Sequence, residues 1–307
     1  MIGKIKGTGA YVPPTCRTNQ EIATMVETSD AWIQERTGIQ SRHIISSDTT
    51  VTMAAKAAQA ALEDAGIQVT EIDLIIVSTM SSNVIMPCAA CEVQKILGAT
   101  HATCFDLNGA CTGFLFAYNT AQGYIAGGMA QTVLVIGTES LSTLLDWTDR
   151  GTCILFGDGA GAVILQSTKG TLPPIVSYSE GMKGEAITCV NNGYMKMDGQ
   201  AVFKFAVKQV PLCIIELLDK LKITIEEIDY FILHQANRRI VESVAKRLHV
   251  SMDKFPVNIK EYGNTSSASI PLLLDEMNKK GELKSGHRLI IVGYGAGLSW
   301  GASFLEW

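Results

Sequence analysis

The sequence contains an internal repeat, and this feature limits the possible folds more strongly than any other. Residues 71–77 (Glu-Ile-Asp-Leu-Ile-Ile-Val) recur 156 residues later as residues 227–233 (Glu-Ile-Asp-Tyr-Phe-Ile-Leu). Residues 134–137 (Leu-Val-Ile-Gly) recur at the same offset as residues 290–293 (Ile-Ile-Val-Gly). Two separate matches at one offset predict that the chain is built from two related halves.

Each half alternates expected helices with short, continuously apolar strands. The expected helices cover residues 54–65 and 89–97 in the first half, and residues 207–221 and 239–248 in the second. In both halves we expect a further strand, a turn rich in glycine and asparagine, a third helix and a closing strand. This order is typical of a mostly parallel sheet with helices on both faces.

The boundary between the halves is expected near residues 166–170, after the apolar run Ala-Val-Ile-Leu. We therefore predict an N-terminal half, residues 1–166, and a C-terminal half, residues 167–307. Two similar α/β halves are expected to pack about a pseudo-twofold axis.

The composition excludes several classes of protein. Of the 307 residues 47% are hydrophobic and only 18% are charged, whereas about 25% charged residues is usual, so the chain is not disordered. The low charge suggests an apolar subunit interface, and the net charge of −5 argues against a general nucleic-acid binder. The longest uncharged stretch, between Asp106 and Glu139, is too rich in glycine and polar residues for a membrane span.

The eight cysteines are spaced too irregularly for a disulfide framework. Cys88 and Cys91 form one C-x-x-C pair, but a second pair with metal-ligand spacing is missing and the five histidines are scattered. We therefore expect reduced thiols and no metal site. The N-terminus has no apolar core of signal-peptide length, so a cytoplasmic location is expected.

The repeat also predicts which residues meet. Adding 156 maps Cys111 onto Ser267, three residues after Asn264, and maps Ser78 onto His234. Functional groups in parallel α/β sheets gather at the carboxyl ends of strands and the following helix starts. A pseudo-twofold axis is therefore expected to bring Cys111, His234 and Asn264 toward one centre.

The setting of these three residues permits nucleophilic chemistry. Cys111 follows a glycine-containing turn and begins a helical run, where backbone N–H groups and the helix dipole stabilise a thiolate. Such a thiolate is a covalent nucleophile, although a small buried cysteine is the common alternative. His234 directly follows an apolar strand, which fits a site better than a core histidine. Asn264 can act as a helix N-cap, as a site amide, or as both.

Two glycine runs invite other interpretations. The run at residues 156–163 (Phe-Gly-Asp-Gly-Ala-Gly-Ala-Val) is followed by an apolar strand, whereas a dinucleotide-binding turn must open a helix. We interpret this run as a tight turn between strands. The run at residues 293–301 either provides flexibility or brings a backbone N–H close to a reacting oxygen.

A local basic patch is expected beside His234. Arg239 and Lys246, seven residues apart, share a face of the expected helix. A solvated surface and a docking site for an acidic partner are both compatible with this pattern.

Several motifs together resemble the β-ketoacyl-acyl-carrier-protein synthase III family. They include Asn-Gly-Ala-Cys111-Thr-Gly-Phe, His234-Gln-Ala-Asn, Tyr-Gly-Asn264-Thr-Ser-Ser-Ala-Ser and the two glycine runs. Residues 29–39 (Ser-Asp-Ala-Trp-Ile-Gln-Glu-Arg-Thr-Gly-Ile) and 149–152 (Asp-Arg-Gly-Thr) also match. The similarity covers essentially the whole chain. It implies the thiolase-like fold, in which two halves form a five-layered αβαβα sandwich, and a homodimer.

The resemblance implies a mechanism in which Cys111 takes a short acyl group from acyl-CoA. His234 and Asn264 would hydrogen-bond the thioester oxygen of malonyl-acyl-carrier protein during decarboxylation. Backbone N–H groups of Cys111 and Gly297 would form an oxyanion hole. Acyl-CoA is then a substrate and no cofactor is implied. The residues implied to bind CoA are Trp32, Arg36, Arg150 and Asn237, and those implied to dock the carrier protein are Arg239, Lys246 and Arg247.

The sequence departs from the family at two places. Met86 stands where the family usually has a phenylalanine that reaches into the acyl pocket of the partner subunit, which leaves the accepted primer length open. Asn108 and Gly109 stand before Cys111 in place of the more usual small residues.

The third site residue separates the nearest relatives. Elongating synthases use histidine where this chain has Asn264, and degradative thiolases carry a second cysteine in the last glycine run, which is absent here. Two alternatives stay open: a related condensing enzyme of secondary metabolism with another acyl donor, and a non-catalytic subunit that binds acyl groups or the carrier protein.

Overall fold

The computed structural model describes all residues, Met1 to Trp307, and places the two halves of the sequence in two mixed sheets. The five strands of the first sheet, in spatial order, are β1 (Ile2–Tyr11), β7 (Asp158–Thr168), β6 (Thr132–Ser140), β4 (Leu74–Ser78) and β5 (Thr103–Leu107). The four strands of the second are β11 (Tyr230–Leu233), β12 (Arg288–Gly295), β13 (Ser299–Glu306) and β8 (Ile175–Ser179). Two small ribbons pair β2 (Cys16–Thr18) with β3 (Ser41–His43) and β9 (Ile187–Thr188) with β10 (Lys196–Met197).

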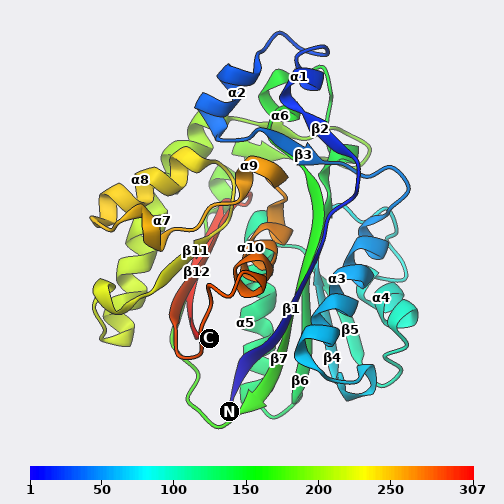
Figure 1. Cartoon of the computed structure of the whole chain (residues 1–307), viewed down its shortest axis with the longest axis vertical. Coiled ribbons are helices and arrows are strands. Elements are labelled where there is room, and N and C mark those ends of the chain that lie inside the picture. The colour runs from blue at the N-terminus through cyan, green and yellow to red at the C-terminus, as the bar shows by residue number, and fades with distance from the viewer.

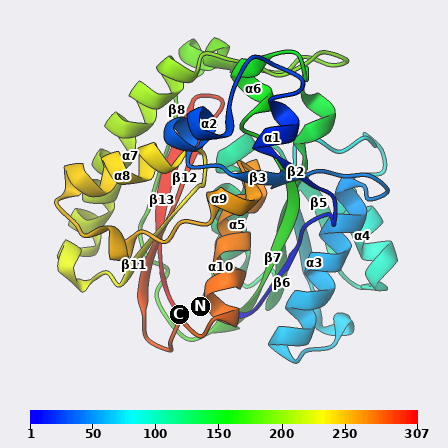
Figure 2. The ribbon, with the colours of Figure 1, turned by 45° about the horizontal axis from the view of Figure 1, so that its top comes forward.

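Helices lie between the two sheets and on both outer faces, which gives five layers (Figures 1 and 2). The central layer holds α5 (Gly113–Ala126) and α10 (Ser269–Lys279). The first sheet is covered by α3 (Thr50–Ala65) and α4 (Ala89–Leu97), and the second by α7 (Gly199–Leu221) and α8 (Arg238–Leu248). The short helices are α1 (Asn19–Ile22), α2 (Asp30–Thr37), α6 (Arg150–Cys153) and α9 (Ile259–Tyr262). The predicted five-layered α/β architecture is confirmed.

The central strands are apolar throughout because both of their faces are buried. In β4, Ile76 faces the core around α5 and α10, while Ile75 faces the core under α3. In β12, Ile291 faces the same central core and Ile290 faces the core under α7. Side chains of a strand alternate between its faces, so a strand between two helical layers needs apolar residues at every position.

Glycines in the sheets let the helices approach closely. A Cβ atom on Gly9 of β1 would lie 2.1 Å from the carbonyl oxygen of Ala57 in α3, and one on Gly161 of β7 would lie 2.7 Å from the backbone nitrogen of Leu272 in α10. Our interpretation of residues 156–163 as a turn between strands is therefore wrong. Most of this run belongs to β7, and its glycines make room for helix backbone.

The repeat is visible in the turns that precede the two central helices. Both turns are 3₁₀ segments, η2 (Ala110–Thr112) and η7 (Ser266–Ala268), and both begin with a non-glycine residue in the left-handed region, Ala110 at φ 46° and Ser266 at φ 49°. Each turn packs on a strand glycine of the other half. A Cβ on Gly137 would lie 2.3 Å from the carbonyl oxygen of Ser267, and one on Gly293 would lie 3.1 Å from the Cα of Thr112.

One expected element is missing from the C-terminal half. Where the repeat predicts a counterpart of β5, the chain forms the short helix α9, so the second sheet has four strands. Asn264, which follows α9, instead makes an isolated bridge with Phe156 of the first half. The Asn264 N–H donates to the carbonyl of Leu155 (2.9 Å), and the Gly157 N–H donates to the carbonyl of Asn264 (3.0 Å). The backbone of Asn264 is therefore held by the other half of the molecule.

None of the helices combines the length and the apolar character that crossing a bilayer requires.

Candidate active site

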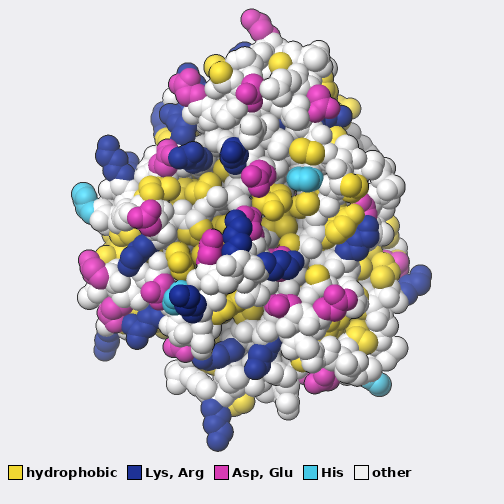
Figure 3. Space-filling model, viewed as in Figure 1, with side chains coloured by type: hydrophobic (Ala, Val, Ile, Leu, Met, Phe, Trp, Pro, Cys, Tyr) yellow, Lys and Arg dark blue, Asp and Glu magenta, His cyan; other side chains and the backbone are white.

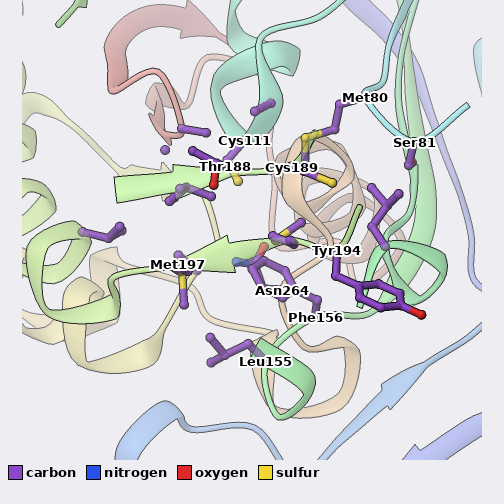
Figure 4. Close-up of a pocket in the computed structure, with 18 of the residues that line it drawn as sticks. Met80, Ser81, Cys111, Leu155, Phe156, Thr188, Cys189, Tyr194, Met197 and Asn264 are labelled. Atoms are coloured by element: carbon purple, nitrogen blue, oxygen red, sulfur yellow. The ribbon is translucent and has the colours of Figure 1, made fainter. Parts of the chain in front are cut away.

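A cavity of about 770 Å³ lies between the two halves, and Cys111, His234 and Asn264 all line it. Figure 4 shows Cys111 and the amide of Asn264 in the same cavity, with Thr188 and Cys189 beside them. The structure thus brings together the three residues whose convergence the repeat predicts. Hydrophobic residues make up more than half of the lining, as is usual for a small-molecule site.

Cys111 lies in η2 at the start of α5 and is 7% exposed. Gly295, at the end of β12, approaches it so closely that a Cβ there would lie 2.6 Å from the Cys111 Cβ. Burial raises the pKa of the Cys111 thiol to about 11, and the charge of Glu139 acts in the same direction. The Ser266 hydroxyl and the N–H groups of Cys111 and Ala296 lower this pKa but do not outweigh burial. Burial of the sulfur therefore opposes the thiolate that we expected at the helix start, while the hydrogen bonds of the turn favour it.

His234 follows β11 and is 1% exposed. Its Nδ1 lies 2.7 Å from the Ser269 Oγ, which also accepts a hydrogen bond from the N–H of Gln235 (3.3 Å). With the Ser269 hydroxyl as the donor to Nδ1, we assign the ring hydrogen to Nε2. Nε2 is buried and has no partner within the protein. Burial lowers the pKa of His234 to about 3, so the ring is neutral and presents an N–H donor.

The amide of Asn264 is oriented by its own turn. Its Oδ1 accepts a hydrogen bond from the N–H of Ser266 (2.9 Å). An N–H donor requires an oxygen as acceptor, so this contact assigns the oxygen and leaves the NH₂ group for the cavity. His234 and Asn264 therefore both offer hydrogen-bond donors to a ligand.

The backbone donor beside Cys111 differs from the one we expected. Gly297, expected in the oxyanion hole, does not line the cavity, whereas Gly295 and Ala296 do. The Ala296 N–H is the neighbouring donor that lowers the pKa of Cys111. Gly297 instead takes φ 134° in the tight connection between β12 and β13, a conformation that favours glycine. The structure thus replaces Gly297 by Ala296 as the candidate donor.

The expected CoA-binding residues lie close to one another, and one of them, Asn237, lines the cavity. The guanidinium carbon atoms of Arg36 and Arg150 lie 5.8 Å and 5.2 Å from the centre of the Trp32 ring, within cation–π range. Asn237 lines the cavity, and its Nδ2 donates to the carbonyl of Arg36 (3.0 Å). Asn237 therefore connects the cavity with the aromatic and basic group around Trp32.

The expected carrier-protein residues lie on the outer helix α8, whose N-cap residue, Asn237, lines the cavity. Arg239, Lys246 and Arg247 are exposed. Arg238 makes an ion pair with Glu242 (2.8 Å), whereas these three residues have no carboxylate partner within the chain. Basic and acidic side chains are interspersed over the face seen in Figure 3, so a basic surface here is a local feature.

Met86 does not line the cavity of its own chain. It is 86% exposed, and the preceding Ile85 is 96% exposed. Both lie between β4 and α4, with Val84 also exposed. These three residues form an exposed apolar loop on the surface of the chain.

The match to family models and relatives covers the site. A model described as 3-oxoacyl-[acyl-carrier-protein (ACP)] synthase III matches residues 105–184, and its C-terminal counterpart matches residues 218–307. Beta-ketoacyl-[acyl-carrier-protein] synthase III of Clostridium acetobutylicum is 48% identical, with 99% of this chain and 98% of the relative covered. The chain belongs to the 3-oxoacyl-[acyl-carrier-protein] synthase III family.

Solved structures agree with this assignment. The synthase III of Aquifex aeolicus superposes with a TM-score of 0.97 at 42% identity, covering 99% of this chain and 100% of the other. A priming β-ketosynthase of the R1128 polyketide pathway superposes with a TM-score of 0.95 at 34% identity, covering 99% of this chain and 96% of the other. The thiolase-like fold implied by the resemblance is therefore confirmed.

Sequence reasoning missed several residues of the site. Ser266 and Ser269 adjoin Cys111 and His234, but a run of small polar residues after Asn264 gave no reason to choose between them. Glu139 is the penultimate residue of β6 and is fully buried, and its charge acts on the Cys111 thiol. A signal was present, because a carboxylate next to the mostly apolar run of a central strand needs buried hydrogen-bond partners.

Proposed function

We propose that the protein is the condensing enzyme that initiates type II fatty-acid synthesis. It takes a short acyl group from acyl-CoA onto Cys111 and condenses it with malonyl-acyl-carrier protein. The observation that carries this proposal is the single cavity in which a cysteine faces two neutral hydrogen-bond donors, in a chain 48% identical to a beta-ketoacyl-[acyl-carrier-protein] synthase III.

In the first half-reaction the Cys111 sulfur attacks the thioester carbonyl, the bond between this carbon and the CoA sulfur breaks, and CoA leaves. The second substrate then enters the empty site. The N–H groups of Cys111 and Ala296 are placed to stabilise the oxygen of the tetrahedral intermediate. A buried sulfur suits this step, because an acyl-enzyme that excludes water is protected from hydrolysis.

In the second half-reaction the malonyl thioester loses CO₂, and negative charge develops on its carbonyl oxygen. The His234 Nε2–H and the Asn264 NH₂ group would donate to this oxygen. A neutral histidine is the right form for this role, and its low pKa keeps it neutral over the whole physiological range. The carbanion then attacks the acyl carbon on Cys111 and releases the β-ketoacyl product.

Substrate access follows from the residues around Trp32 and Asn237. We propose that Trp32, Arg36 and Arg150 bind the CoA nucleotide and that Asn237 contacts the pantetheine arm. No metal or cofactor is needed for either step.

We further propose residues 1–166 and 167–307 as the two structural halves, and a cytoplasmic location.

We also propose a homodimer. The exposed apolar loop with Val84, Ile85 and Met86 provides an apolar surface that a second copy of the chain would cover. Met86 would then reach the acyl cavity of the partner subunit.

The test of the function is to incubate the protein with a series of acyl-CoAs and to measure its intact mass. One acyl group per chain is expected for short primers, and subsequent addition of malonyl-acyl-carrier protein should remove it as β-ketoacyl product. An adduct that forms only with a different acyl donor, and not with short acyl-CoAs, would favour the secondary-metabolism alternative. That alternative is supported by the similarity to the R1128 priming synthase. Absence of any adduct would contradict the proposal and favour a binding subunit.

The Arg239→Glu substitution tests the docking surface. It is expected to raise KM for malonyl-acyl-carrier protein about tenfold or more, because the substitution changes the charge by two units at a surface that attracts an acidic partner. Acylation by acyl-CoA should change little. The control is Lys95→Glu, the same change of charge on an exposed residue of α4, at the opposite outer layer. Steady-state kinetics with each substrate decides the matter. Equal losses with both substrates would contradict a docking role.

A further inference from the structure

The buried carboxyl of Glu139 has no role in the mechanism above, although it lies beside the reacting cysteine. It is the penultimate residue of β6, is 0% exposed and accepts hydrogen bonds from both halves of the molecule. Its Oε2 accepts hydrogen bonds from Ser81 (2.6 Å), the N–H of Met80 (3.1 Å) and Thr79 (3.3 Å). Its Oε1 faces the hydroxyls of Ser267 (3.0 Å) and Ser266 (3.4 Å) in η7.

The acyl-transfer step needs a group that accepts a proton, and the known site residues do not supply one. The Cys111 thiol is protonated in the free protein, because burial raises its pKa to about 11. His234 is a poor base, because burial lowers its pKa to about 3. In addition its Nδ1 is already engaged by Ser269 and its Nε2 carries the hydrogen.

We propose that Glu139 is a positioning residue that accepts the proton of Cys111 through the hydroxyl of Ser266. The Ser266 hydroxyl lowers the pKa of the Cys111 thiol, and its Oγ lies 3.4 Å from the Glu139 Oε1. Burial raises the pKa of Glu139 to about 7, so the carboxyl can both take up and release a proton near neutrality. This inference rests on the proposed acyl transfer to Cys111.

The proton balance of the step is closed within the site. As the Cys111 sulfur bonds to the acyl carbon, its hydrogen moves to the Ser266 oxygen and the hydrogen of Ser266 moves to Glu139. The bond between the acyl carbon and the CoA sulfur breaks, and CoA leaves with the electron pair. The proton then returns through Ser266 to the CoA thiolate, which restores the Glu139 carboxylate and gives CoA as a thiol.

A purely electrostatic role for Glu139 would have the opposite effect. The negative charge of Glu139 raises the pKa of the Cys111 thiol. Removal of the charge alone would therefore favour the thiolate and speed acylation. A purely structural role would affect both half-reactions, since Glu139 fixes residues on both sides of the cavity.

The experiment is single-turnover acylation by acetyl-CoA, followed by rapid quenching and intact mass, in the wild type, Glu139→Gln, Ser266→Ala and the double variant. Glu139→Gln is expected to slow acylation about 100-fold, the lower range for a lost general base. The wild-type rate should rise as the pH passes about 7, where the carboxyl ionises, and this rise should vanish in Glu139→Gln. The titratable group facing Glu139 is Cys111, and its other contacts from residues 79–81 and η7 are hydroxyls and a backbone N–H.

The control variant is Asp158→Asn, which makes the same carboxyl-to-amide change at another fully buried acid. Asp158 accepts from the N–H groups of Ile45 (2.7 Å) and Ser142 (2.8 Å) and does not line the cavity. It should keep the wild-type rate and pH dependence.

If the proton passes from Cys111 through Ser266 to Glu139, each single variant already blocks this transfer. The double variant should therefore be no slower than the slower single variant. An additive loss, an unchanged rate, a retained rise near neutral pH in Glu139→Gln, or an equal loss in Asp158→Asn would each overturn the proposal. If Glu139→Gln does not fold, the acylation rate of Ser266→Ala tests the proposal on its own: a slower rate supports it and an unchanged rate overturns it. Failure of the wild type to form any acyl adduct would instead contradict the proposed function.

Discussion

Replacing Cys111 by alanine is expected to abolish acyl transfer from acyl-CoA while the protein stays folded. Alanine lacks the nucleophilic sulfur but keeps the backbone N–H of residue 111, so only the attacking group is lost. Loss of one buried atom of this size should cost about 1 kcal/mol of stability. Intact mass after incubation with acetyl-CoA measures the adduct, and thermal unfolding checks the fold.

The matched control is Cys189→Ala, since Cys189 is the other cysteine that lines the cavity. Cys189 lies beyond β9 on an exposed part of the lining, and neither a helix start nor the Ala296 N–H adjoins it. The Cys189→Ala variant should still take up one acyl group per chain. An acyl group found on Cys189 in the Cys111→Ala variant would contradict the assignment of the nucleophile.

The internal repeat made the architecture and the meeting of the two turns predictable. An offset of 156 residues relates Ala110 to Ser266, and both residues have the same left-handed backbone. It also relates Gly137 to Gly293, and each packs against a turn of the other half. The two turns share these features because a tight turn between a strand and a helix permits few backbone conformations.

What the sequence could not predict depends on packing between the halves. The repeat wrongly predicted a strand before Asn264, because the backbone of Asn264 is held by Leu155 and Gly157 from the other half. From the sequence we chose Gly297 rather than Ala296. A glycine can be required either by a tight turn or by close approach to a ligand, and the sequence alone does not distinguish these two reasons. The degree of burial of Cys111, and with it the direction of its pKa shift, likewise depends on contacts between segments far apart in the chain.

The two central turns now have different tasks in the proposed reaction. The turn of the first half carries the nucleophile, while the corresponding turn of the second half supplies Ser266 and Ser269, which adjoin Cys111 and His234. Because each turn packs on a strand of the other half, the site exists only when both halves are assembled. A variant that loosens one turn should therefore affect both half-reactions, whereas loss of a single donor should affect one.

Replacing Asn264 by aspartate is expected to remove condensation while leaving acyl transfer to Cys111 within a few-fold of the wild type. One oxygen of the new carboxylate can still accept the Ser266 N–H, so the turn is preserved. The other oxygen cannot donate and carries negative charge where the enolate oxygen develops. Loss of one such donor should slow decarboxylation about 100-fold to 1,000-fold. Release of CO₂ from malonyl-acyl-carrier protein measures this step, and intact mass measures acylation.

The repeat supplies the control for this variant, because Asn108 is the counterpart of Asn264 in the first half and also lines the cavity. Asn108→Asp introduces the same carboxylate into the same cavity without removing the proposed donor. We expect it to slow decarboxylation far less than Asn264→Asp does. Equal losses in the two variants would mean that added charge, and not the missing donor, accounts for the effect. Retained condensation in Asn264→Asp would contradict the donor role of Asn264 and leave His234 as the proposed donor to the enolate.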